Sequence, residues 1–87
     1  MRPAPQVAWA AQIDGVLLVG PAGRTHSLGY PAAAIWDLLV RQRPRARMVR
    51  MLSAIASLDE RTARRLVDEA IEQWLAAGLV VEVARGG

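Results

Sequence analysis

The side chains that could carry acid–base or metal chemistry gather in one segment of the chain. Most of the acidic residues fall there: Asp59, Glu60, Asp68, Glu69 and Glu72. Asp68 and Glu72 are four residues apart, so on a helix they would share one face and could bind a cation or share a proton. The same segment places Arg64 four residues before Asp68 and Arg65 four residues before Glu69. This spacing favours ion pairs along the helix over a catalytic or metal site.

Nucleophilic catalysis lacks the residue types that it requires. The chain has no cysteine, which excludes disulfides, thiolate ligands and a cysteine nucleophile, and its single histidine cannot form a histidine-based zinc site. In the run Thr25-His26-Ser27, neighbours on an extended segment point to opposite faces, so His26 cannot act as a base for either hydroxyl. We therefore expect a binding protein without a cofactor, against the alternative of a small acid–base enzyme.

The basic charge is concentrated in the middle of the chain. All 11 basic residues are arginine, and the formal net charge is +3. Residues 41–50 hold five of these arginines and no acidic residue: Arg41, Arg43, Arg45, Arg47 and Arg50. Such a block could attract a polyanion or an acidic peptide, or it could be a solvated loop and helix face.

The elements that must position these residues fit one small domain. A chain of 87 residues has room for one modest core and for no second domain. No apolar run approaches the roughly 18 residues that a membrane span requires. Residues 1–6 lack the apolar stretch of a signal peptide. We expect a cytoplasmic protein that has no membrane partner.

Three short strands are expected first. Residues 7–12 alternate in a period of two, 16–19 form an apolar β-branched run, and 24–28 form a short polar strand. Asp14-Gly15 and residues 20–23 supply the turns of an antiparallel meander. The polar third strand suits a sheet edge, where it could accept another chain as an added strand or pair with a second copy in a homodimer.

Three helices follow the strands. Apolar residues recur at helical spacing over 32–40, 45–56 and 60–77, and Gly78 suits the end of the third helix. Residues 79–83 are apolar and β-branched, which is typical of a short strand or an extended segment on the core. This order predicts an α+β fold, a three-stranded antiparallel sheet followed by three helices, similar to a winged helix-turn-helix domain.

Two of the three tryptophans are expected in the core. Trp36 and Trp74 lie on the apolar stripes of the first and third predicted helices. Trp9 lies in the first predicted strand, where we expect it to be less buried.

Several stretches resemble the PqqD family, whose small domains are also called RiPP recognition elements. The quoted stretches are Asp14–Val19, Gly23–Leu28 and Ala32–Leu39, the last containing Ala-Ile-Trp-Asp-Leu-Leu. The ending, from Asp59 through Val67, Ile71 and Trp74 to Gly78-Leu79-Val80, resembles the third helix and Gly-Leu tail of that family. Together they cover about residues 7–81, which is most of the chain.

The resemblance implies one PqqD-like peptide-binding domain over residues 1–87, with its core at about 7–83. Such a domain binds the leader segment of a ribosomally synthesised precursor peptide by strand addition to the third strand, beside the third helix. It then delivers the peptide to a separate modifying enzyme, such as a radical enzyme, protease or cyclase. Pyrroloquinoline quinone biosynthesis and lasso-peptide biosynthesis both use this type of protein.

The resemblance also assigns roles by position. Strand backbone would come from Thr25, His26, Ser27 and Leu28, the groove would be lined by Ala63, Leu66, Ala70 and Gln73, and leader acids would be attracted by Arg24 and Arg65. The chain departs from the family pattern at Gly29, Leu66 and Ala70, where Asn, Asp and a large aromatic residue are frequent. A proline at His26 is expected to remove an edge amide.

A winged-helix nucleic-acid-binding or regulatory domain is the alternative, and the arginines of residues 41–50 motivate it. The third helix would then be the recognition helix. Its acidic residues, Asp68, Glu69 and Glu72 among them, would repel phosphates, which disfavours a nucleic-acid partner.

Overall fold

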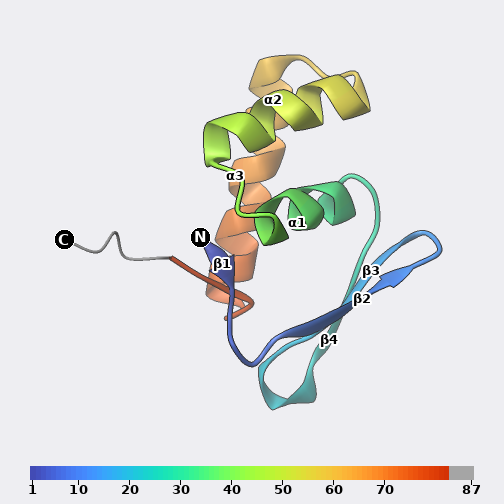
Figure 1. Cartoon of the computed structure of the whole chain (residues 1–87), viewed down its shortest axis with the longest axis vertical. Coiled ribbons are helices and arrows are strands. Elements are labelled where there is room, and N and C mark those ends of the chain that lie inside the picture. The colour runs from blue at the N-terminus through green and yellow to red at the C-terminus, as the bar shows by residue number, and fades with distance from the viewer. Residues whose placement is uncertain (83–87) are drawn as a thin grey trace.

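The computed structural model describes residues 1–82 and has the predicted α+β, winged-helix-like architecture (Figure 1). An antiparallel sheet of order β2-β3-β4 comes first, and it is built from Ala8–Gln12, Gly15–Val19 and Thr25–Leu28. Three helices follow: α1 (Ala32–Val40), α2 (Arg45–Ala56) and α3 (Glu60–Ala76). The hairpin of β2 and β3 extends away from the helices in Figure 1. Within residues 1–82, none of the helices has the length and apolar content to cross a membrane.

The turn between β2 and β3 lies one residue earlier than the sequence predicts. Gln12 pairs with Gly15, so Ile13 and Asp14 form the two-residue turn and Gly15 belongs to the strand. A Cβ atom at Gly15 would overlap the carbonyl oxygen of Leu28. Glycine is therefore needed here for the close approach of β4. The prediction placed Gly15 in the turn because Asp-Gly is a frequent turn pair.

A second, two-stranded sheet joins the two ends of the described chain. Its strands are β1 (Arg2–Pro3) and β5 (Val80–Val81), which pair antiparallel. The Ala4 N–H donates a hydrogen bond of 2.9 Å to the Leu79 carbonyl, and Ala4 is buried. The structure thus confirms a final strand. The core also includes Ala4, which precedes the expected core of residues 7–83. The end of that expectation, Val83, lies outside the described residues.

The helix bounds follow the apolar periodicity closely. The first two helices have the predicted bounds, and the third ends at Ala76 rather than Ala77. A short 3-10 turn, η1 (Pro21–Gly23), connects β3 to β4. After α3, Gly78 has a φ of +72°, the left-handed conformation that favours glycine just past a helix.

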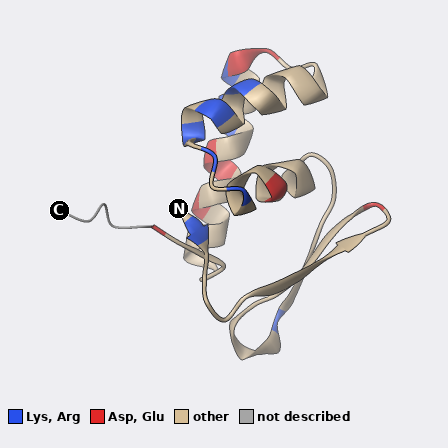
Figure 2. Ribbon diagram, in the orientation of Figure 1, with Lys and Arg blue, Asp and Glu red and all other residues tan. Residues whose placement is uncertain are grey.

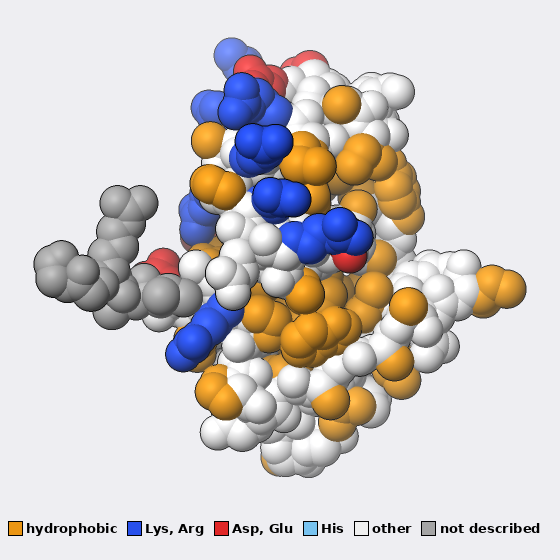
Figure 3. All heavy atoms as spheres, in the orientation of Figure 1, with side chains coloured by type: hydrophobic (Ala, Val, Ile, Leu, Met, Phe, Trp, Pro, Cys, Tyr) orange, Lys and Arg blue, Asp and Glu red, His pale blue; other side chains and the backbone are white. Residues whose placement is uncertain are grey.

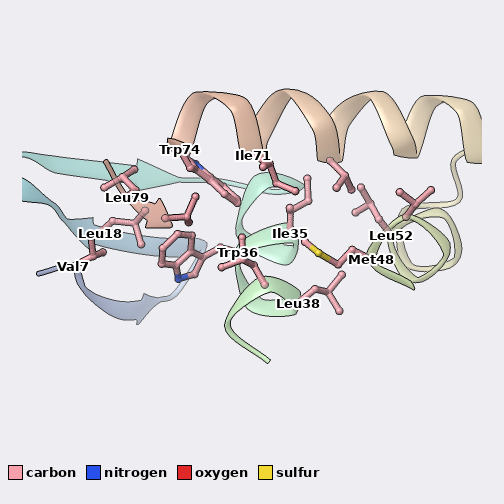
Figure 4. Packing of buried hydrophobic residues seen from close by; sticks show 14 of the residues in the cluster. Val7, Leu18, Ile35, Trp36, Leu38, Met48, Leu52, Ile71, Trp74 and Leu79 are labelled. Carbon is pink, nitrogen blue, oxygen red and sulfur yellow. The ribbon is translucent and has the colours of Figure 1, made fainter. Parts of the chain in front are cut away.

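Trp36 on α1 is the centre of the hydrophobic core (Figure 4). Its ring meets Trp9 of β2 edge to face, with centroids 5.7 Å apart, and meets Trp74 of α3 in the same way at 5.2 Å. Trp36 and Trp74 are buried, as predicted, whereas 43% of Trp9 is exposed. The three rings therefore link the sheet, the first helix and the third helix through one continuous contact.

We predict that Trp36→Ala destabilises the fold more than Trp9→Ala does. Truncating a fully buried tryptophan costs about 3–5 kcal/mol, whereas the half-exposed Trp9 should cost about 1–2 kcal/mol. Urea denaturation followed by far-UV circular dichroism measures both free energies of unfolding. Equal losses for the two variants would contradict the central position of Trp36.

Candidate functional site

Strand β4 is an edge of the three-stranded sheet, as the sequence predicts. It pairs with β3 on one side, and the order β2-β3-β4 leaves its other side without a strand among residues 1–82. The pairing sets Leu18 opposite His26 and Leu17 opposite Ser27. An edge of this kind presents backbone N–H and C=O groups that another chain can use.

The register identifies which backbone groups of β4 face the open edge. The Gly20 N–H donates a 2.7 Å hydrogen bond to the Arg24 carbonyl, so this opposed pair is hydrogen-bonded. Hydrogen-bonded pairs alternate along an antiparallel ladder, so the backbone of His26 also faces β3. The N–H and C=O groups of Thr25 and Ser27 point to the open edge. The expectation that a proline at His26 removes an edge amide is therefore wrong.

The side chains of β4 alternate between two surroundings. His26 and Leu28 are half-buried on the face that packs toward the helices, whereas Thr25 and Ser27 are exposed on the opposite face. Leu18, opposite His26, is completely buried. A strand added along β4 would follow the same alternation and would direct every second side chain toward the helices.

A small hollow opens between the start of α1 and the middle of α3. Its first lining residue, Pro31, follows the last residue of β4 by three positions in the sequence. Its volume is about 170 Å³. Its lining residues are Pro31, Ala32, Ile35, Leu66, Glu69, Ala70 and Gln73. The structure thus brings together Leu66, Ala70 and Gln73, three of the four residues that the family resemblance assigns to a groove.

The sequence-based assignment of Ala63 to the groove lining is wrong. It has no accessible surface and packs in the core, so it supports α3 from beneath and offers nothing to a ligand. Sequence reasoning missed the lining residues Pro31, Ala32 and Ile35, together with Glu69. Ala32 and Ile35 come from α1, and Pro31 directly precedes it. The approach of α1 to α3 depends on tertiary packing that helical periodicity does not reveal.

The charges around this site are mostly balanced. Arg65 and Glu69 form the predicted ion pair along α3, with 4.0 Å between Nε and Oε1. Arg24 is exposed just before β4 and has no carboxylate within 4.0 Å among the described residues. Arg24 is therefore the cation near β4 that remains available to an incoming carboxylate.

One acidic residue of α3 has a different ion-pair partner from the predicted one. The predicted Arg64–Asp68 pair is wrong, because Asp68 pairs instead with Arg45 of α2 at 3.3 Å. Among residues 1–82, no group of three or more histidine, aspartate or glutamate side chains could hold a metal ion.

Comparisons with known proteins agree with this geometry. The family described as coenzyme PQQ synthesis protein D (PqqD) matches residues 14–80. A solved structure titled "TbiB1 in Complex with the TbiA(beta) Leader Peptide" superposes with a TM-score of 0.89 at 23% identity, covering 98% of this chain and 100% of that one. At this identity the likeness establishes a shared fold. No curated protein matches the chain.

The two kinds of β4 residue should respond differently to proline. His26→Pro would remove a hydrogen bond to β3 and should cost about 3 kcal/mol of stability. Ser27→Pro would remove an N–H that points to solvent, so it should cost no more than about 1 kcal/mol. Thermal and urea unfolding of the two variants measures the difference. The reverse order would contradict the assigned hydrogen-bonding alternation.

Proposed function

The chain belongs to the coenzyme PQQ synthesis protein D (PqqD) family, and from this membership we propose that it binds the leader segment of a ribosomally synthesised precursor peptide. The open edge of β4 carries the proposal, because it offers backbone groups that no strand among residues 1–82 uses. The fold shared with TbiB1, a protein solved in complex with a leader peptide, supports the same function.

We propose that the leader adds to β4 as a further strand. Thr25 and Ser27 would exchange backbone hydrogen bonds with the leader, and the segment Arg24–Leu28 would set its register. Main-chain hydrogen bonds of this type give affinity with little dependence on sequence. Specificity must then come from the side chains that the leader turns toward the helices.

The hollow between α1 and α3 would receive one of those side chains. Its volume of about 170 Å³ is below the several hundred Å³ that small-molecule pockets usually enclose, so it suits a single apolar residue of the leader. Ala70 leaves this space open, and Leu66 gives it an apolar wall. The Gln73 amide could hydrogen-bond to the leader backbone at the rim.

Electrostatics would favour an acidic residue in the leader near the start of β4. Arg24 is exposed there, and a charge-assisted hydrogen bond to a carboxylate is stronger than a neutral one. Arg65 would attract leader acids more weakly, because Glu69 already neutralises it.

The bound leader would be delivered to a separate modifying enzyme, such as a radical enzyme, a protease or a cyclase. In this role the chain is a peptide chaperone formed by one domain over residues 1–87, and it works in the cytoplasm. Self-association through β4 would use the same backbone groups as the leader. A homodimer of that kind would therefore compete with leader binding.

The nucleic-acid alternative is less well supported. In a winged-helix domain the third helix would enter the groove of the duplex. The exposed side of α3 carries Glu60, Glu69 and Glu72, which would repel the phosphate backbone.

Leader affinity should depend on the edge and on the hollow separately. The ligand is a synthetic leader peptide of a candidate precursor, and fluorescence anisotropy measures its Kd. Ser27→Pro removes one backbone hydrogen bond, so the Kd should rise about three- to tenfold. Ala70→Leu fills the hollow, so the Kd should rise by about tenfold or more.

Ala46→Leu is the matched control, because it makes the same change at an exposed position of α2 outside the groove. Its Kd should remain that of the unmodified chain. A leader that binds all three variants with unchanged affinity would exclude β4 and the hollow as its site.

A further inference from the structure

A second surface, built from α1 and α2, combines free cations with exposed apolar side chains. Of the arginines in residues 41–50, Arg41 pairs with Asp37 at 3.1 Å and Arg45 pairs with Asp68 at 3.3 Å. The other three, Arg43, Arg47 and Arg50, are exposed and have no carboxylate within 4.0 Å in the described part of the chain. Figure 2 shows the arginines gathered along α2 and the loop before it.

Apolar side chains lie directly beside these cations. Two shallow hollows adjoin along α2, one of about 350 Å³ and one of about 290 Å³, and Met51 lines both. Arg47, Arg50 and Ala54 complete the first. The second is lined by Ala34, Asp37, Leu38, Arg41, Arg43, Met51 and Ile55. In Figure 3 the blue arginine column runs next to hydrophobic atoms on this side of the molecule.

We define the arginine face as Arg43, Arg47, Arg50, Met51, Ala54 and Ile55. Spacings of three and four residues place Arg47, Arg50, Met51, Ala54 and Ile55 along one side of α2. Arg43 lies in the loop just before α2 and lines the same hollow as Met51 and Ile55. From Arg47 to Ile55 the row is about 12 Å long at 1.5 Å per residue, which matches about two turns of a partner helix. Ile55 is 56% exposed, whereas isoleucine is among the residues most often buried in folded proteins.

We propose that the arginine face docks an amphipathic helix of another protein, with apolar residues along its centre and acidic residues along one edge. The charge complementarity is direct, because residues 41–50 contain no acid and three of their arginines are unpaired within residues 1–82. A phosphate backbone would use the cations and gain nothing from the exposed Ile55 or from the part-buried Met51 beside it. The mixture of the two types therefore favours a protein partner.

The arginine face is separate from the groove beside β4. The hollow between α1 and α3 is lined by Ala32 and Ile35 of α1, whereas the arginine-face hollow is lined by Ala34 and Leu38 of the same helix. None of the lining residues is shared. Both surfaces can therefore be occupied together, and a partner docked at the arginine face leaves β4 open.

The test uses the full chain and a synthetic amphipathic helical peptide of about 18 residues, with Leu along its centre and Glu along one edge. A scrambled peptide of the same composition and a DNA duplex are the competing probes. We expect the amphipathic peptide to bind at least about tenfold more tightly than the scrambled one. Amide shifts on binding should concentrate at Arg47, Arg50, Met51 and Ile55.

Two double charge reversals distinguish binding at the arginine face from a general effect of the net charge of the protein. R47E with R50E should weaken peptide binding about tenfold or more. R61E with R64E makes the same charge change at exposed positions of α3 and should change the Kd by less than about threefold. Ile55→Ser should weaken binding without any change in charge. Leader affinity should be unaffected by R47E with R50E, which keeps this test independent of the function proposed above.

Three results would overturn the proposal. Equal affinity for the scrambled peptide would show that the arginine face attracts any acidic peptide and does not recognise an amphipathic helix. Equal effects of the two double reversals would place the interaction elsewhere. Tighter binding of the duplex than of the peptide, lost in R47E with R50E, would assign the surface to nucleic acid.

Discussion

The edge-to-face contacts of Trp36 are the constraint on which the other features of the structure depend. Trp36 lies on the short helix α1, and its ring contacts Trp9 of the sheet and Trp74 of α3. A domain of this size has one small core, so the orientation of each element relies on a few large side chains. The contact between Trp36 and Trp74 joins α1 to α3, and the hollow lined by Ala32, Ile35, Leu66 and Ala70 lies between the same two helices.

Helix α1 consequently contributes to two surfaces of opposite character. Ala32 and Ile35 line the hollow against α3, whereas Ala34 and Leu38 line the basic hollow against α2. Small side chains on a helix allow both hollows to form while the bulky Trp36 fills the core. In the proposed function, the edge strand would hold the leader while the separate basic surface would hold the second protein.

Local patterns predicted the helices well, and long-range contacts explain most of the errors. Apolar periodicity gave α1 and α2 with the observed bounds because it reports which face each helix buries. The partner of Asp68 is Arg45, 23 residues away, so an intrahelical rule could not find it. Ala63 lies on α3 like Leu66 and Ala70, but contact with other elements buries it. The outward amides of Thr25 and Ser27 follow from the register with β3, which residue types alone do not specify.

Hydrogen exchange at the backbone amides of β4 tests the central claim, addition of the leader to this strand, most directly. In the free protein the His26 amide should be protected by β3, and the Thr25 and Ser27 amides should exchange rapidly. With saturating leader peptide, Thr25 and Ser27 should become protected while His26 changes little. Rapid exchange at Thr25 and Ser27 in the complex, with new protection confined to other elements, would contradict strand addition at β4.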